Sequence, residues 1–113
     1  MERWQIVENF VKTLSDEEER WDLLPWEQVA ECVKIMSSAD GLKKDTDGKT
    51  KHAEFDWQKK KPFFQYFTRK TMRHFAEFLG GSLYDKDSGK DPLAHVIFNA
   101  LCLLWGNKHL RKS

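Results

Sequence analysis

The segment DPLAHVIFNALCLLWG, residues 91–106, constrains the fold most, because it has the length of a helix and is apolar on nearly every side. A helix of this kind is stable in water only when other elements surround it. Asp91 is a favoured N-cap residue and Pro92 a favoured first-turn residue, so the helix is predicted to begin there and to run to Trp105, with Gly106 ending it. The apolar run is too short to span a bilayer. We therefore expect the central helix of a globular domain.

Three further segments repeat apolar residues at helical spacing, over residues 3–14, 25–36 and 62–79. Pro25 and Pro62 fit the first turn of the second and third of these helices. Ser15, with Glu18 three residues later, forms a capping box and predicts a short extra helix over residues 15–21. No segment has a convincing strand period. The sequence thus predicts an all-α fold, a compact bundle of about four main helices in a single domain, residues 1–113.

The chain is polar from Gly41 to Lys61, where KKDTDGKTKHAEFDWQKKK has almost no apolar period, and most of this stretch is predicted to be a long Lys-rich loop before the third main helix. Phe55 and Trp57 are its only large aromatic residues. A loop of this length within a compact domain is usually functional or disordered.

The composition is that of a globular protein, with 40% hydrophobic and 33% charged residues and a net charge of +1. This balance favours neither sequence-specific nucleic acid nor a membrane as partner. Charged residues interrupt the N-terminus before a signal peptide could form. Cys32 and Cys102 both lie in apolar helical patterns, which is typical of thiols in a reducing compartment. We expect a cytoplasmic protein.

His95 and Asn99 lie one turn apart on the most apolar helix, where each would cost about 1–3 kcal/mol if buried without a hydrogen-bond partner. They could be satisfied core groups that fix the helix register. They could instead face a polar site between helices.

Polar residues near the junction of the last two predicted helices favour such a site. His74 and Glu77 form a His-x-x-Glu pair that can direct both groups at one ion. Glu77 could alternatively pair with Arg73 on the solvated face. Asp85 and Asp87 follow in a Gly/Ser turn, where they could coordinate a hard cation or serve as ordinary turn residues.

Two other charged groups could also contribute to a site. Glu31 forms an acidic i, i+4 pair with Glu27, although a solvated helix face explains this pair as well. Lys60, Arg69 and neighbouring basic residues could bind phosphate oxygens, or could simply be solvated. The sequence has no phosphate-binding P-loop, dinucleotide-binding glycine turn, zinc-spaced Cys/His set or nucleophile elbow.

The segment FDWQKKKPFFQYFTRKTMRHFAEFLGGSLYDKDSGKDPLAHVIFNALCLLW resembles the dATP/dGTP diphosphohydrolase N-terminal-domain family, which is found largely in phages and prophages. That family has an Asn-Trp, an Arg-His helix, a Gly-Glu, an acidic turn with Ser/Thr-Gly, and a His-Leu-Ala-His helix with an Asn. The matching positions are Asp56-Trp57, Arg73-His74, Gly80-Gly81, Asp85–Gly89, Leu93-Ala94-His95 and Asn99. DLLPWEQVAECVKIM also resembles the opening helix of the family.

The chain departs from the family pattern at three places. The usual Gly-Ala-x-Lys-Tyr-Gly segment is not recognisable in Ala39–Glu54, Pro92 replaces the first histidine of His-Leu-Ala-His, and Gly81 replaces the acid of Gly-Glu. If these positions bind metal or nucleotide, specificity is altered or activity is lost.

The resemblance implies a phage-encoded enzyme that uses Mg²⁺ or Mn²⁺ to hydrolyse dATP or dGTP to the monophosphate and pyrophosphate. It also implies a homo-oligomer in the host-cell cytoplasm. The metal site would use His74, Asp85, Asp87 and His95, and the catalytic acids would be Glu31 and Glu77. Substrate would contact Trp57, Lys60, Arg69, Arg73 and Asn99.

Two other functions remain open. The chain could be a non-catalytic helical phage protein that binds a nucleotide or a host protein, which the departures from the family favour. It could also be a helical oligomer that acts through an exposed Trp/Phe surface.

Overall fold

The structure, a computed structural model, describes residues 1–39 and 55–111, and this part of the chain forms helices and turns without a strand. Its α-helices are α1 (Arg3–Leu14), α2 (Trp26–Ala39), α3 (Phe63–Leu79) and α4 (Pro92–His109). Two short 3-10 helices, η1 (Trp21–Leu23) and η2 (Asp56–Lys59), precede α2 and α3. The all-α prediction is confirmed. Residues 41–54, the larger part of the predicted Lys-rich loop, lie outside the described residues.

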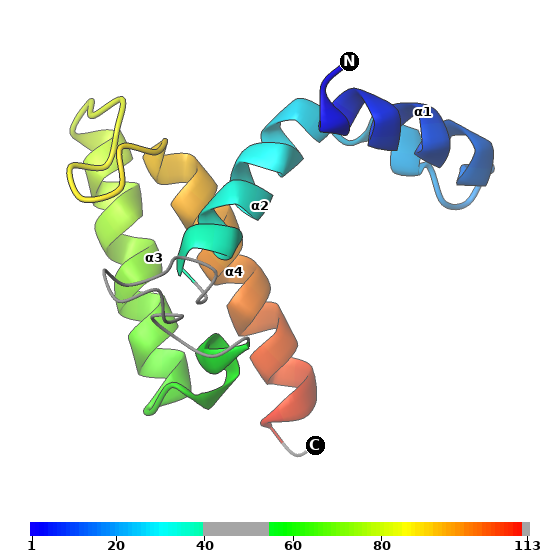
Figure 1. Cartoon of the computed structure of the whole chain (residues 1–113). Helices are drawn as coiled ribbons and strands as arrows, with labels where there is room; N and C mark the ends of the chain where they lie inside the picture. The colour runs from blue at the N-terminus through cyan, green and yellow to red at the C-terminus, as the bar shows by residue number, and fades with distance from the viewer. Residues whose placement is uncertain (40–54, 112–113) are drawn as a thin grey trace, which may run out of the picture.

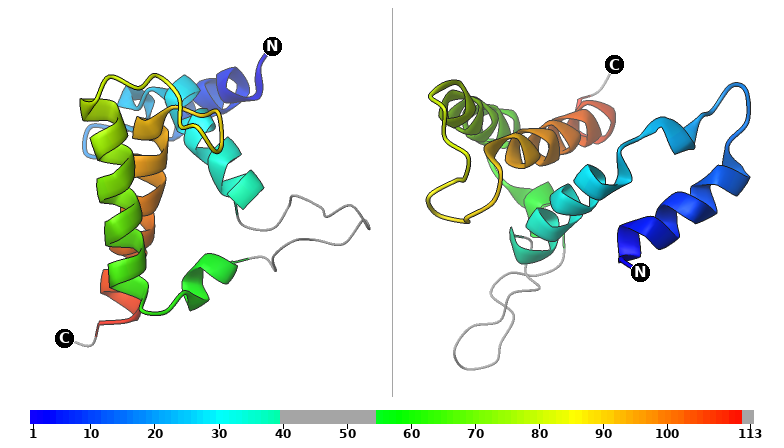
Figure 2. Two further views of the ribbon diagram at one scale, coloured as in Figure 1. Left: turned by 90° about the vertical axis from the view of Figure 1, so that its left-hand side faces the viewer. Right: turned by 90° about the horizontal axis from the view of Figure 1, so that it is seen from above.

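The helices α3 and α4 form an antiparallel hairpin, and residues 80–91 connect them at one end (Figure 1). The helix α2 packs against α4, while α1 packs against α2 and η1 and extends away from the hairpin (Figure 2). η2 lies near the opposite end of the hairpin from the 80–91 connection (Figure 1). None of the helices in the described ranges combines the length and apolarity needed to cross a membrane.

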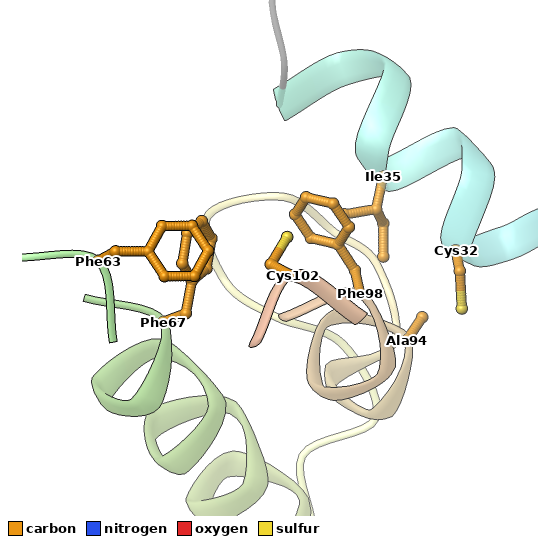
Figure 3. Packing of buried hydrophobic residues seen from close by; sticks show 7 residues of the cluster. All are labelled: Cys32, Ile35, Phe63, Phe67, Ala94, Phe98 and Cys102. Carbon is orange, nitrogen blue, oxygen red and sulfur yellow. The ribbon is translucent and has the colours of Figure 1, made fainter. Parts of the chain in front are cut away.

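The hydrophobic core lies between α2, α3 and α4 (Figure 3). On α4, Ala94, Phe98 and Cys102 are buried at intervals of four residues, so they form one stripe along the helix. Phe63 and Phe67 supply the facing stripe of α3 at the same interval. Each large buried side chain stabilises the fold by about 1.5–3 kcal/mol relative to an exposed one. This packing fixes the hairpin whose connected end carries the polar residues discussed below.

The predicted start of α4 is confirmed, but its predicted end is wrong. Asp91 caps the helix, with its side chain accepting a hydrogen bond from the Leu93 amide at 2.9 Å. Gly106 does not end the helix, which continues to His109. Gly106 is buried and lies directly against the Phe63 ring. A Cβ added at Gly106 would overlap Cε1 of that ring and lie 3.0 Å from its Cδ1. The glycine therefore serves close packing within the helix.

The short helix predicted over residues 15–21 is also wrong. The side chain of Asp16 accepts hydrogen bonds from the amides of Glu18 and Glu19 at 2.9 and 2.8 Å, which closes a turn instead. The Ser15 hydroxyl accepts from the Asp22 amide at 3.0 Å rather than from the amide at the predicted N3 position. These local hydrogen bonds compete with a helix, so only the single turn of η1 follows.

Candidate active site

His74 is a buried imidazole on the side of α3 that faces the hairpin connection, with only 3% of its surface exposed. Its Nδ1 lies 3.0 Å from Oε1 of Glu77, one turn along α3, and 3.5 Å from Oδ1 of Asp85 in the connection. Neither carboxylate meets this nitrogen with hydrogen-bond geometry, so Nδ1 has no hydrogen-bond partner. The three side chains bring their donor atoms within 4.8 Å of one another. The arrangement can hold a cation.

Asp85 is fixed by the backbone of its own turn. Its Oδ2 accepts hydrogen bonds from the amides of Asp87 and Ser88 at 3.2 and 2.9 Å, which leaves Oδ1 directed at His74. The turn closes through a hydrogen bond from the Gly89 amide to the Asp85 carbonyl at 2.7 Å. Gly89 has a φ of +70°, which favours glycine at this position. Backbone amides thus hold Oδ2 of Asp85 in place, while Oδ1 faces His74.

His95 stacks on His74 across the hairpin. The ring centroids are 4.2 Å apart and the planes are inclined by 11°. Nε2 of His95 lies 2.7 Å from the Ser88 hydroxyl, so Ser88 connects His95 to the turn that holds Asp85. His95 is therefore bonded within the polar cluster, and its stacked position supports the ring of His74 rather than placing a nitrogen among the three donor atoms.

The protonation states suit cation binding at neutral pH. Burial is the main cause that lowers the pKa of His74, and the nearby Asp85 only partly opposes it. Burial likewise lowers the pKa of His95, and His74 adds to the effect. Burial alone would raise the pKa of Asp85, but its hydrogen bonds with Ser88, together with Glu77 and His74, lower it to about 2. Desolvation, followed by the influence of Asp85, raises the pKa of Glu77. The imidazoles of His74 and His95 are thus neutral at pH 7 and lie beside two carboxylates, Glu77 and Asp85, that influence each other.

Two cavities adjoin the cluster. The smaller, of about 190 Å³, is lined by Ile35, Lys70, Arg73, His74, Asp85, Asp87, Ser88, His95, Phe98 and Asn99. The larger, of about 500 Å³, is lined by Arg73, Glu77, Ser82, Tyr84, Asp85, Lys86 and Asp87. The larger volume falls in the range of small-molecule sites. Arg73, Asp85 and Asp87 line both cavities, so the cluster is reached from two sides.

The structure brings most of the predicted site residues to this end of the hairpin. His74, Glu77 and Asp85 form the cluster, and the residues that surround it are His95, Asp87, Arg73 and Asn99. Asn99 is buried one turn beyond His95 on α4 and lines the smaller cavity.

The other predicted residues lie elsewhere. Glu31 is exposed on α2 and lines neither cavity. Trp57 packs edge-on against Trp105, at a centroid distance of 5.0 Å, and Trp105 is about 15 Å along α4 from His95. Lys60 lies 5.4 Å from the Tyr66 ring, and Arg69 lines a separate hollow with Phe64, Gln65 and Thr68. None of these four residues lines either cavity that adjoins the cluster.

Sequence reasoning missed Ser88, Lys70, Tyr84 and Lys86 as site residues. Ser88 follows Asp85 by three residues in a Gly-containing turn, a spacing at which a side-chain carboxylate commonly accepts from the backbone, so this signal was available. Lys70 lies one turn before His74 on α3, which helical spacing could also have indicated. The positions of Tyr84 and Lys86 depend on the path of the 80–91 connection, which could not be predicted because this segment has no periodic sequence pattern.

The fold and cluster together define a helical domain with a candidate cation site beside two cavities. Residues 9–112 match the family described as dATP/dGTP diphosphohydrolase, N-terminal. The match covers nearly the whole sequence, and the chain belongs to this family. No curated protein and no solved structure matches the chain.

Proposed function

We propose that the protein is a metal-dependent deoxynucleoside triphosphate diphosphohydrolase that converts dATP or dGTP to the monophosphate and pyrophosphate. The observation that carries the proposal is the buried Nδ1 of His74, which faces two carboxylates without a hydrogen-bond partner. Buried polar atoms are nearly always satisfied, so an orphan among acidic groups points to an absent cation. The family supplies the substrate class.

A divalent cation, which the family resemblance implies to be Mg²⁺ or Mn²⁺, would be held by His74, Glu77 and Asp85. Bound there, it would neutralise triphosphate charge and acidify a water molecule. The donor set fits, because neutral imidazole and ionised carboxylate are the forms that bind metals. Asp87 lines both cavities and is exposed, so it would contribute from the edge of the cluster.

Basic side chains would bind the phosphates. Arg73 lines both cavities, Lys70 lines the smaller and Lys86 the larger, so cationic groups face the acidic cluster from each side. The planar guanidinium of Arg73 can bind two phosphate oxygens at once, while each lysine adds a point charge. Glu77 is half-buried at the boundary with the larger cavity, where it would hold the attacking water.

The larger cavity would receive the nucleoside. Tyr84 is 68% exposed and lines this cavity, so its ring offers a surface on which a base can stack. Trp57, expected to play this part, is packed against Trp105 instead. We therefore assign the base contact to Tyr84 in place of Trp57.

The test is a pyrophosphate-release assay with each deoxynucleoside and ribonucleoside triphosphate, in Mg²⁺, Mn²⁺ or EDTA. We expect metal-dependent release from dATP or dGTP. Asp85→Asn and His95→Ala should abolish or strongly reduce turnover in folded protein. Asp16→Asn is the matched control, because Asp16 is an exposed turn acid in the N-terminal region. Unchanged turnover in Asp85→Asn would reject the proposed site.

A binding function is the second candidate, and the exposed apolar face of α1 favours it. Ile6, Phe10 and Leu14 are 55%, 62% and 57% exposed, which is unusual for the apolar stripe of a helix. Such a face suits a second copy of the chain or a host protein.

A nucleotide binder without activity is distinguished by a different result. Thermal stabilisation of the protein by a nucleotide, without pyrophosphate release, would favour it.

A further inference from the structure

We propose that the cluster selects a nitrogen-binding first-row transition-metal ion, such as Co²⁺, Ni²⁺ or Zn²⁺, over Mg²⁺. The inference rests on the metal site of the proposed function and specifies the ion that it takes. It does not require that the protein hydrolyse any nucleotide. The argument uses the positions, the chemical type and the rigidity of three donor atoms.

The donor positions suit one small ion. Two ligand atoms bonded to the same ion at about 2.0–2.2 Å can be at most about 4 Å apart. Nδ1 of His74 is 3.0 Å from Oε1 of Glu77 and 3.5 Å from Oδ1 of Asp85. Both pairs of atoms therefore lie within the span that a single ion can bridge.

The donor types disfavour Mg²⁺. Imidazole nitrogen is a good ligand for zinc, iron and nickel, whereas Mg²⁺ prefers an octahedral shell of oxygen atoms and retains several waters. The side chains of His74 and Asp85 are each only 4% exposed, so an ion between them must give up water on that side. A site that contributes a buried imidazole nitrogen therefore favours the transition-metal ion.

The donors are held before any ion binds. The stacked ring of His95 limits rotation of the His74 imidazole, and backbone amides fix Oδ2 of Asp85. Groups that orient metal ligands in this way commonly change metal affinity by about 10–100-fold. The Arg73 guanidinium lies 3.4 Å from Nε2 of His74. Ion binding at Nδ1 places the ring proton on Nε2, so the exposed Arg73 would turn away toward the cavities.

The experiment measures binding of the metal chlorides alone to the full, tag-free chain after chelator treatment and dialysis. Isothermal titration and thermal denaturation are recorded with Co²⁺, Ni²⁺, Zn²⁺ and Mg²⁺. We expect one transition-metal ion per chain and a Kd at least about tenfold below that for Mg²⁺, with a corresponding rise in Tm. An affinity for Mg²⁺ equal to that for Co²⁺, Ni²⁺ and Zn²⁺, or no binding of any ion, would overturn the proposal.

His74→Gln tests the role of the nitrogen donor. The variant should weaken Co²⁺, Ni²⁺ and Zn²⁺ binding by about tenfold or more, and unchanged binding would overturn the proposal. His109→Gln is the matched control, because His109 is an exposed imidazole on α4 that stacks on Trp105 and should not affect the affinity. If His74→Gln fails to fold, Glu77→Gln at the half-buried edge of the cluster replaces it, with the same expected loss.

The failures of the two proposals are distinguishable. Transition-metal binding without pyrophosphate release would reject the enzyme and leave the ion preference intact. Pyrophosphate release accompanied by equal binding of Mg²⁺ and Zn²⁺ would reject the ion preference and leave the enzyme intact.

Discussion

Gly106→Ala tests whether close packing between α3 and α4 holds the hairpin in the arrangement described. In an open helix position this change stabilises a protein by about 1 kcal/mol, because alanine has the higher helix propensity. Here the new methyl group would overlap the Phe63 ring, lying 3.0 Å from Cδ1 and 3.2 Å from Cζ. Overpacking of this kind costs about 1–3 kcal/mol. The net effect should be a loss of up to about 2 kcal/mol in the free energy of unfolding.

Urea denaturation followed by circular dichroism measures this loss. Asn107→Ala is the matched control, because Asn107 is the adjacent exposed residue of α4 and should stabilise the chain by about 0.5 kcal/mol through propensity alone. Adding Phe63→Leu to Gly106→Ala should relieve part of the strain, so the two changes should be non-additive. If Gly106→Ala raised stability by about 1 kcal/mol, the packing of Gly106 against Phe63 would be refuted.

Three further changes test local features. Asp91→Ala removes the N-cap of α4 and should lower the free energy of unfolding by about 1 kcal/mol in urea denaturation, and no loss would contradict the cap. Gly89→Ala places a side chain at a φ of +70° and should cost about 1–2 kcal/mol, and an unchanged Tm would argue against this turn. The side-chain hydrogen bond from Arg20 is the main cause that lowers the pKa of Asp22, from 3.8 to about 2. Because the folded-state pKa is the lower one, this pair stabilises the fold above pH about 4, and its contribution is lost as the pH falls through about 2. A carboxyl NMR titration should show the shift, and Arg20→Gln should return the midpoint toward 3.8.

The main helices could be predicted because their apolar spacing and their end signals agree. Pro62 before α3 and Asp91 before α4 each mark a helix start in the sequence, and the structure has both. Gly106 misled because glycine has two physical uses, to end a helix or to allow another residue to approach closely. Only the position of Phe63 shows which use applies, and that position depends on tertiary packing.

The candidate site was predictable in part for the same reason. Helical spacing placed His74 and Glu77 on one face of α3, and the acidic turn indicated Asp85 nearby. Spacing could not show that His95 stacks on His74 while Ser88 bonds to it, because this depends on how α4 is rotated against α3. Nor could it show that Trp57 packs against Trp105 away from the cluster.

Product identification by phosphorus NMR tests the central proposal most directly. The full chain is incubated with dGTP and then with dATP, in Mn²⁺ and in EDTA, and the phosphorus resonances are followed over time. We predict that pyrophosphate and the deoxynucleoside monophosphate appear together in equal amounts with Mn²⁺ and not with EDTA. Inorganic phosphate as the first product, or unchanged triphosphate in the presence of Mn²⁺, would contradict the proposed diphosphohydrolase.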